Sequence, residues 1–161
     1  MKILVFSDSH NCPKRILKAV DAHHGKCDLI IFLGDGLRDL DSLNIKYPNI
    51  PIIKVQGNCD IFANNDVVSE TILDFDGIKI LITHGHKHGV KYGYGGIVNY
   101  ASDLDVDAVF FGHTHIPCDE IEYIGERKIH LFNPGSVATT STYGVVNTSN
   151  SVLITNIAKI Y

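Results

Sequence analysis

The feature that most constrains the fold is a series of short apolar runs, each followed by a stretch rich in Asp, Asn, His and Gly. The first three runs are KILVF at Lys2–Phe6, DLIIFL at residues 28–33 and PIIKV at residues 51–55. Apolar runs of this length, spaced by segments long enough for a crossover, are typical of buried strands. Their order favours a parallel sheet with right-handed crossovers.

Helices and hairpins are predicted between and after these strands. Residues 13–24 have a proline in the first turn and apolar residues on one face, which predicts a helix. Asp76-Gly77 separates two apolar runs and predicts a tight hairpin of residues 67–75 and Ile78–Thr83. We also expect a short helix at residues 37–43, a helix at 97–104, and strands at 107–111, 120–124, 128–132, 143–147 and 152–157. This mixture favours two sheets packed face to face with helices outside.

Length and composition fit one domain over residues 1–161, which is long enough for a core without disulfides. The net charge of -4 and the lack of a basic stripe give no reason to expect binding to long nucleic acids. Apolar runs are much shorter than the roughly 20 residues that span a bilayer, and the first run lacks the length of a signal peptide. We therefore expect a cytoplasmic protein that does not bind membranes, and a homodimer is left open.

Side chains able to bind metal ions gather directly after five predicted strands. They are Asp8 and His10, then Asp35, then Asn58 and Asp60, then His84 and His86, and finally His113 and His115. In open α/β sheets, ligands bind beyond the carboxyl ends of the strands. We therefore expect these side chains to meet at one edge of the protein, although each one alone would also fit a turn, a helix cap or a surface histidine.

The ligand types favour divalent metal ions. Carboxylate, amide and imidazole together suit Mn²⁺, Fe²⁺, Zn²⁺ or Ni²⁺ better than an ion that prefers thiolates. Asp8 and His10 lie two residues apart, so on an extended segment both side chains point the same way and can hold one ion. A carboxylate such as Asp35 can bridge two cations about 4 Å apart, and such a pair can lower the pKa of a shared water and stabilise developing charge.

The same stretches resemble the calcineurin-like metallophosphoesterases, and above all the small single-domain bacterial and archaeal phosphodiesterases of that superfamily. They are Ser7-Asp8-Ser9-His10, Leu33-Gly34-Asp35, Gly57-Asn58-Cys59-Asp60, Thr83-His84-Gly85-His86, Gly112-His113-Thr114-His115 and Asn133-Pro134-Gly135-Ser136. They occur in the family's order and extend over residues 7–136. The resemblance implies a four-layer α/β/β/α sandwich of two mixed sheets with helices outside.

The resemblance also implies two divalent cations and a ligand scheme. Asp8, His10 and His115 would hold the first cation, Asn58, His84 and His113 the second, and Asp35 would bridge both. Mn²⁺ is the commonest activator of similar proteins, with Ni²⁺, Co²⁺, Fe²⁺ or Zn²⁺ as alternatives. In such enzymes a metal-bound hydroxide attacks phosphorus in line with the leaving oxygen.

One position departs from the family pattern. Many members carry His directly after the motif Asn, where it is proposed to protonate the leaving group, whereas this chain has Cys59. We therefore take His86 as the candidate general acid, because an imidazole transfers protons near neutral pH, and a positioning role for His86 stays open. Asp60 is expected to orient the Asn58 loop, with a solvated turn as the other interpretation, and Cys59 to lie behind the ligands.

The resemblance implies hydrolysis of small phosphodiesters, because the chain is short and has no large insertion that would cover its site. Two alternatives are a phosphomonoesterase of the same fold and a non-catalytic metal-binding interaction scaffold that resembles a subunit of eukaryotic membrane-trafficking coats. A scaffold need not keep all seven ligand positions, and this chain has a suitable residue at every one. The sequence therefore favours the enzyme.

Overall fold

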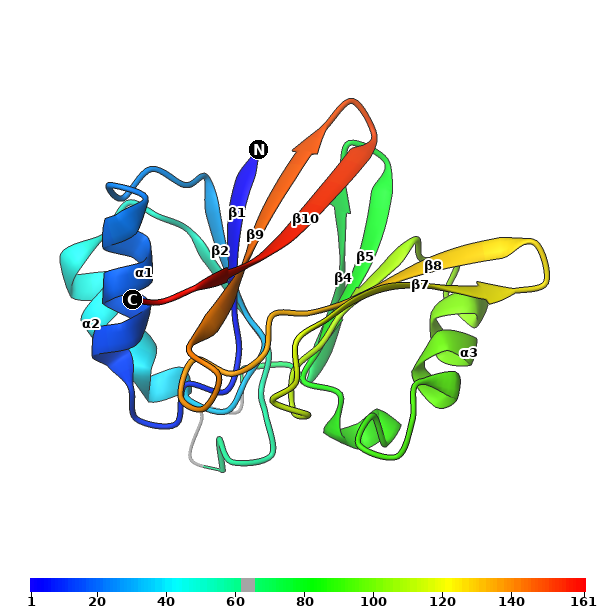
Figure 1. Cartoon of the computed structure of the whole chain (residues 1–161), viewed down its shortest axis with the longest axis horizontal. Coiled ribbons are helices and arrows are strands. Elements are labelled where there is room, and N and C mark those ends of the chain that lie inside the picture. Colours follow the sequence, from blue (N-terminus) through cyan, green and yellow to red (C-terminus); the bar gives the residue numbers. More distant parts are fainter. Residues whose placement is uncertain (62–65) are drawn as a thin grey trace.

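The structure, a computed structural model, describes residues 1–61 and 66–161. Within these ranges, ten strands form two sheets of five strands each (Figure 1). The first sheet has the order β10 (Val152–Lys159), β9 (Thr142–Ser149), β1 (Lys2–Phe6), β2 (Leu29–Phe32) and β3 (Ile52–Lys54). The second has the order β4 (Glu70–Phe75), β5 (Ile78–Thr83), β6 (Ala108–Phe110), β8 (Arg127–Asn133) and β7 (Cys118–Ile124).

Both sheets have a parallel centre and antiparallel strands at the edges. β1, β2 and β3 are parallel, and so are β5, β6 and β8. β9 and β10 extend the first sheet in antiparallel fashion, while β4 and β7 do the same for the second. The expected mixed sheets are thereby confirmed, and the carboxyl ends of five parallel strands, β1, β2, β3, β5 and β6, precede the motif loops.

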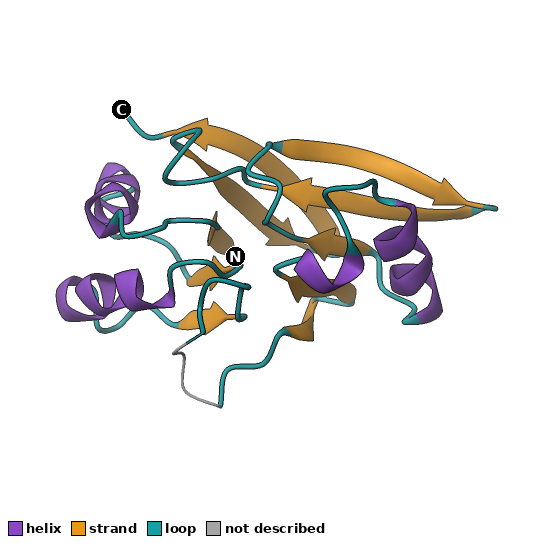
Figure 2. Ribbon diagram, turned by 90° about the horizontal axis from the view of Figure 1, so that it is seen from below, coloured by secondary structure: helices purple, strands orange, loops and turns teal. Residues whose placement is uncertain are grey.

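Helices cover the outer face of each sheet. α1 (Pro13–Ala22), the short 3₁₀ helix η1 (Leu37–Asp39) and α2 (Leu40–Lys46) pack on the first sheet, and α3 (Gly95–Asp103) packs on the second. Figure 2 shows helices on both flanks with the strands between them. The structure also has a 3₁₀ turn, η2 (His86–His88), between β5 and α3.

Alternation along β1 shows how the layers are joined. Leu4 and Phe6 pack against the helices, whereas Ile3 and Val5 pack between the sheets against residues such as Phe132 of β8. All of these side chains are fully buried, as expected for a strand covered on both faces. The predicted four-layer α/β/β/α sandwich is confirmed by these packing clusters.

The boundaries of several elements differ from the prediction. α3 begins at Gly95 instead of residue 97, and β4 begins at Glu70 instead of residue 67. α1 ends at Ala22, shortly before Gly25, where φ is +64° and a Cβ would lie 2.6 Å from the Tyr47 ring. No helix in the described ranges has the length and apolar character needed to cross a membrane.

Candidate metal centre

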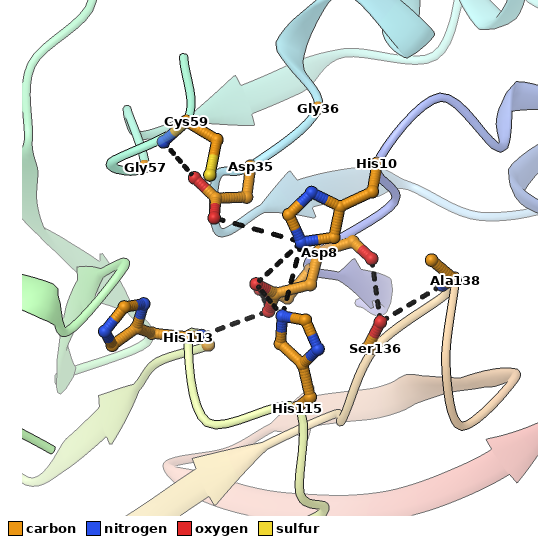
Figure 3. A network of polar contacts seen from close by, with 12 residues as sticks. Asp8, His10, Asp35, Gly36, Gly57, Cys59, His113, His115, Ser136 and Ala138 are labelled. Atoms are coloured by element: carbon orange, nitrogen blue, oxygen red, sulfur yellow. Dashed lines mark hydrogen bonds and ion pairs between the residues drawn. The ribbon is translucent and has the colours of Figure 1, made fainter. Parts of the chain in front are cut away.

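Histidine and carboxylate side chains from the ends of several strands converge in one place (Figure 3). His115 Nε2 lies 3.1 Å from Asp8 Oδ1 and 3.2 Å from His10 Nε2. His84 Nε2 lies 3.4 Å from Asp35 Oδ2 and 3.9 Å from Asp8 Oδ1. His10 Nε2 lies 3.9 Å from Asp35 Oδ2, so His10 connects the two carboxylates' surroundings. Residues up to 107 positions apart in the sequence therefore share one small volume.

Among the described residues, the convergent side chains form three overlapping groups that could each hold a cation, with the ligand atoms of each group within 4.8 Å of one another. Two of them share no residue, and these are Asp8, His10 and His115, and Asp35, His84 and His113. The third group takes His10 and Asp35 from these two and adds Cys59. His113 is held close to Asp8 as well, because its backbone N–H donates to Asp8 Oδ2 at 3.0 Å. The arrangement places two candidate cation positions side by side, with the two carboxylates between imidazoles.

Unpaired polar atoms inside the centre fit a bound cation. Asp8 Oδ1 and His84 Nε2 are buried and have no hydrogen-bond partner among the described residues. Asp8 Oδ2, by contrast, accepts from Ser7 Oγ at 2.6 Å. His84 Nδ1 lies 2.7 Å from the Leu33 carbonyl, so this nitrogen carries the proton and the lone pair of Nε2 faces the carboxylates. Buried polar atoms without partners are costly, and a metal ion would satisfy both.

The backbone of the centre is held in an uncommon conformation. φ is positive at Asp8 (53°), His10 (40°), Asp35 (60°), His113 (66°) and His115 (61°). Non-glycine residues in this left-handed region each cost on the order of 1 kcal/mol, and they persist only where the surrounding structure enforces them. The turns that carry these side chains therefore lower the stability of the fold. Strained backbone of this kind gathers at functional sites, so the turns indicate that this is one.

Electrostatics favours the metal-binding protonation states of Asp35 and His113, whereas it favours the protonated ring of His84 when no metal ion is bound. Burial would raise the pKa of Asp35, but His84 and the Cys59 N–H outweigh it and hold this pKa well below its usual range. Burial, together with His84 and Lys91, lowers the pKa of His113 to about 4. Burial opposes the charge on His84 too, yet the Asp35 and Asp8 carboxylates outweigh it and raise the His84 pKa.

We expect His113 to make the metal-free protein less stable as the pH falls from 7 to 5. The folded ring has a pKa of about 4 against an ordinary 6.5, so the unfolded chain binds more protons in this window and the free energy of unfolding decreases. In the His113→Gln variant, the decrease in the free energy of unfolding between pH 7 and pH 5 should be smaller by on the order of 1 kcal/mol. Urea unfolding with chelator at both pH values measures it, and the same pH dependence in both proteins would contradict the prediction.

Asp60 connects the two loops that carry Asp35 and Asn58. Its carboxylate is almost fully buried and accepts four backbone N–H groups, at 2.7 Å from Asp35, 2.9 Å from Gly36, 3.0 Å from Leu37 and 3.0 Å from Gly57. The sequence analysis expected Asp60 to orient the loop of Asn58. The structure places it between that loop and the loop after β2, where it acts on both.

Three expected residues lie at the rim of the centre. Asn58 is exposed, and its Nδ2 donates to Cys59 Sγ at 3.2 Å. The Cys59 N–H donates to Asp35 Oδ1 at 2.7 Å, and burial and Asp35 raise the pKa of its thiol to about 11. The His86 ring centroid is 5.4 Å from that of His84, and its Nδ1 is buried without a partner among the described residues. Burial and His84 lower the pKa of His86.

The sequence analysis assigned no role to several groups that support the ligands. Ser136 Oγ donates to the Asp8 carbonyl at 2.8 Å and accepts from the Ala138 N–H at 3.1 Å (Figure 3). Thr139 Oγ1 lies 3.4 Å from His115 Nδ1. In the sequence, residues 133–136 are only one of the stretches that resemble the family. No local pattern could have identified these contacts, because Ser136 and Asp8 are 128 positions apart.

The fold and the centre together define a metal-binding α/β/β/α sandwich protein. A family model described as the calcineurin-like phosphoesterase superfamily domain matches residues 1–155. The chain belongs to the calcineurin-like phosphoesterase superfamily, which confirms the resemblance seen in its motifs. Membership of this metal-dependent family supports a hydrolase of phosphoesters.

Sequence relatives carry related names. The chain is 34% identical to the probable metallophosphoesterase YsnB of Bacillus subtilis, over 93% of this chain and 86% of the relative. It is 29% identical to the phosphodiesterase YfcE of Escherichia coli, over 63% of this chain and 54% of the relative.

Solved structures agree on the fold. A conserved protein of Streptococcus pneumoniae, described as a predicted phosphoesterase, superposes with a TM-score of 0.75 at 24% identity, over 99% of this chain and 92% of that one. An archaeal phosphodiesterase superposes with a TM-score of 0.71 at 24% identity, over 98% of this chain and 100% of that one. A Vps29 variant of Entamoeba histolytica superposes with a TM-score of 0.77 at 19% identity, over 98% of this chain and 91% of that one.

Proposed function

We propose that the protein is a phosphodiesterase that hydrolyses small phosphodiesters with two divalent cations. Mn²⁺ is the first candidate for these cations, and Ni²⁺, Co²⁺, Fe²⁺ and Zn²⁺ are the alternatives. The observation that carries this proposal is the pair of adjacent ligand groups around Asp8 and Asp35. These groups contain Asp8 Oδ1 and His84 Nε2, two buried atoms that have no hydrogen-bond partner among the described residues. Mixed oxygen and imidazole ligands suit these metals. Membership of the phosphoesterase superfamily supports the reaction class.

The proposed roles follow the two groups. Asp8, His10 and His115 hold one cation, Asn58, His84 and His113 hold the other, and Asp35 contacts both. Two cations bound by these residues would supply an activated water and would neutralise charge on the phosphoryl group. His86 exchanges a proton with the leaving oxygen or positions the substrate. This role is supported by its place beside Asn58 in the lining of a surface depression of about 310 Å³.

A metal-by-substrate screen tests the proposal. With Mn²⁺, bis-p-nitrophenyl phosphate should be hydrolysed with a higher kcat/KM than p-nitrophenyl phosphate, and chelator should remove both activities. The reason is that two depressions, of about 240 and 310 Å³, lie beside the centre, one lined in part by His10 and Asp35 and the other by Asn58 and His86. They leave room for a second ester substituent. A higher kcat/KM for the monoester would favour the phosphomonoesterase alternative, and turnover that survives chelation would contradict the proposed metal chemistry.

The scaffold alternative makes a different prediction. The likeness to Vps29 structures is below 25% identity and concerns the fold alone. A scaffold that binds metal without catalysis would take up Mn²⁺ and show no hydrolysis of either ester. The same screen, combined with metal analysis of the purified protein, therefore separates the two functions.

A further inference from the structure

The 3₁₀ turn η2 carries His86 at the edge of the candidate metal centre. It has three residues, and the glycines on either side of it, Gly85 and Gly89, have positive φ values of 94° and 63°. None of its three residues is buried, so η2 places no side chain of its own in the core. Glycine gives the backbone wide conformational freedom. The position of His86 therefore depends on the contacts that η2 makes with neighbouring elements.

Glu70, at the start of β4, provides contacts of this kind. Its Oε2 accepts from His88 Nε2 of η2 at 2.7 Å, and its Oε1 accepts from the Tyr100 hydroxyl of α3 at 2.7 Å. An ionised carboxylate can only accept hydrogen bonds, so His88 Nε2 carries the proton. The rings of His88 and Tyr100 also lie against each other, with their centroids 4.8 Å apart. The Glu70 carboxylate thus joins β4, η2 and α3.

The junction at Glu70 is shielded from solvent and carries a charge. The side chains of Glu70 and His88 are 27% and 14% exposed. Burial would raise the pKa of Glu70, but the hydrogen bonds from His88 and Tyr100 outweigh it and lower this pKa. Hydrogen bonds to an ionised acceptor are roughly twice as strong as those between neutral groups. A further contact of η2, from Lys87 Nζ to Ser69 Oγ at 3.0 Å, supports the junction on its exposed side.

The turn η2 reaches the candidate metal centre through His86. The ring centroid of His86 is 5.4 Å from that of His84 and 6.1 Å from that of His113, two of the proposed ligands. His86 Nδ1 is buried and has no hydrogen-bond partner among the described residues, so this nitrogen does not orient the ring. His86 also lines the depression of about 310 Å³ beside Asn58. A displacement of η2 would therefore move the His86 ring within this depression.

The geometry points to Glu70 as a positioning residue that fixes η2 through His88 and Tyr100 and thereby holds His86 in place for the reaction. The inference rests on the proposed phosphodiesterase function, in which His86 acts on the leaving oxygen or on the substrate. The described lining of the depression does not include Glu70, so Glu70 acts through His86 and not by touching the substrate. Glu126, exposed in the turn between β7 and β8, offers a control for the loss of one glutamate elsewhere.

A double-mutant cycle with bis-p-nitrophenyl phosphate and Mn²⁺ tests whether Glu70 acts through His86. Glu70→Ala should lower kcat about tenfold, because a small misplacement of a group that acts on the substrate slows the reaction strongly. His86→Ala should lower kcat at least as much. In the His86→Ala background, Glu70→Ala should cost less than about twofold, since no ring is left to position. Glu70→Gln and Tyr100→Phe each keep part of the junction and should lower kcat less than Glu70→Ala, and Glu126→Ala should keep the wild-type kcat.

Amide hydrogen exchange of the metal-free protein gives a measurement that does not depend on catalysis. The His88 N–H donates to the Gly85 carbonyl at 3.0 Å, so loosening of η2 should speed exchange in peptides that cover residues 86–88. Glu70→Ala should speed this exchange about tenfold, measured by mass spectrometry. Glu126→Ala should leave it unchanged.

Three results would overturn the inference and leave the phosphodiesterase intact. The first is an unchanged kcat in Glu70→Ala or in His86→Ala. The second is a tenfold loss from Glu70→Ala that persists in the His86→Ala background, because a merely structural role for Glu70 would act independently of that ring. The third is unchanged exchange in η2. Absence of hydrolysis by the wild-type protein would overturn the proposed function and this inference with it.

Discussion

Replacing Asp35 with Asn is expected to reduce Mn²⁺-dependent hydrolysis of bis-p-nitrophenyl phosphate by roughly a thousandfold or more. Asp35 Oδ2 lies 3.4 Å from His84 Nε2 and 3.9 Å from His10 Nε2, so this carboxylate contacts ligands of both proposed cations. An amide of the same shape removes the negative charge that would hold the two proposed cations together. The kcat/KM value and the Mn²⁺ content per protein, measured by mass spectrometry of the metal, should fall together.

Asp103→Asn serves as the matched control for Asp35→Asn. Asp103 is exposed at the end of α3, so its replacement changes the net charge equally without touching the centre. Activity and metal content should stay at wild-type values in this variant. If Asp35→Asn also kept both values, the centre described above would not be the source of the activity.

Replacing Asp60 with Ala should lower the free energy of unfolding by about 3–5 kcal/mol. Four backbone N–H groups would lose their acceptor, and the loops that carry Asp35 and Asn58 would lose their connection. Urea unfolding monitored by circular dichroism measures the change. Activity should fall as well, because the loops no longer fix the ligands.

Two further variants give losses in the free energy of unfolding with which Asp60→Ala can be compared. Asp60→Asn keeps one acceptor oxygen and should lower the free energy of unfolding by less than Asp60→Ala. Asp74→Ala removes an exposed carboxylate that accepts a single backbone N–H, from Gly77 at 2.8 Å, and should cost about 1 kcal/mol or less. A loss in Asp60→Ala as small as that in Asp74→Ala would show that the buried network does not stabilise the fold.

Much of the architecture could be predicted from the sequence because the signals are local. The run at Lys2–Phe6 and the Asp76-Gly77 hairpin reappear as β1 and as the connection between β4 and β5, with positive φ at Asp76 and Gly77. The convergence of Asp8, Asp35 and His84 followed from one rule about where parallel strands end. Element boundaries were less accurate, because capping and tertiary packing decide them.

The supporting contacts of the centre could not be predicted. The His84–Leu33 contact and the four N–H groups bound by Asp60 depend on how separate loops are positioned against each other. The packing of the two sheets sets the first contact, and the placement of the loops after β2 and β3 within the first sheet sets the others. The depression lined in part by His10 and Asp35 has a similar origin, since its lining comes from three loops that follow β1, β2 and β3.

The left-handed backbone at five proposed ligand residues has a consequence beyond the reaction itself. An ion that binds only the folded chain stabilises it in proportion to the logarithm of the ion concentration, and here it also offsets turns that are unfavourable on their own. The abundance of intact protein in a cell should therefore follow the supply of the metal ion that the centre binds. In a cell short of this ion, quality-control proteases would degrade more of the protein, and the protein that remains would be inactive.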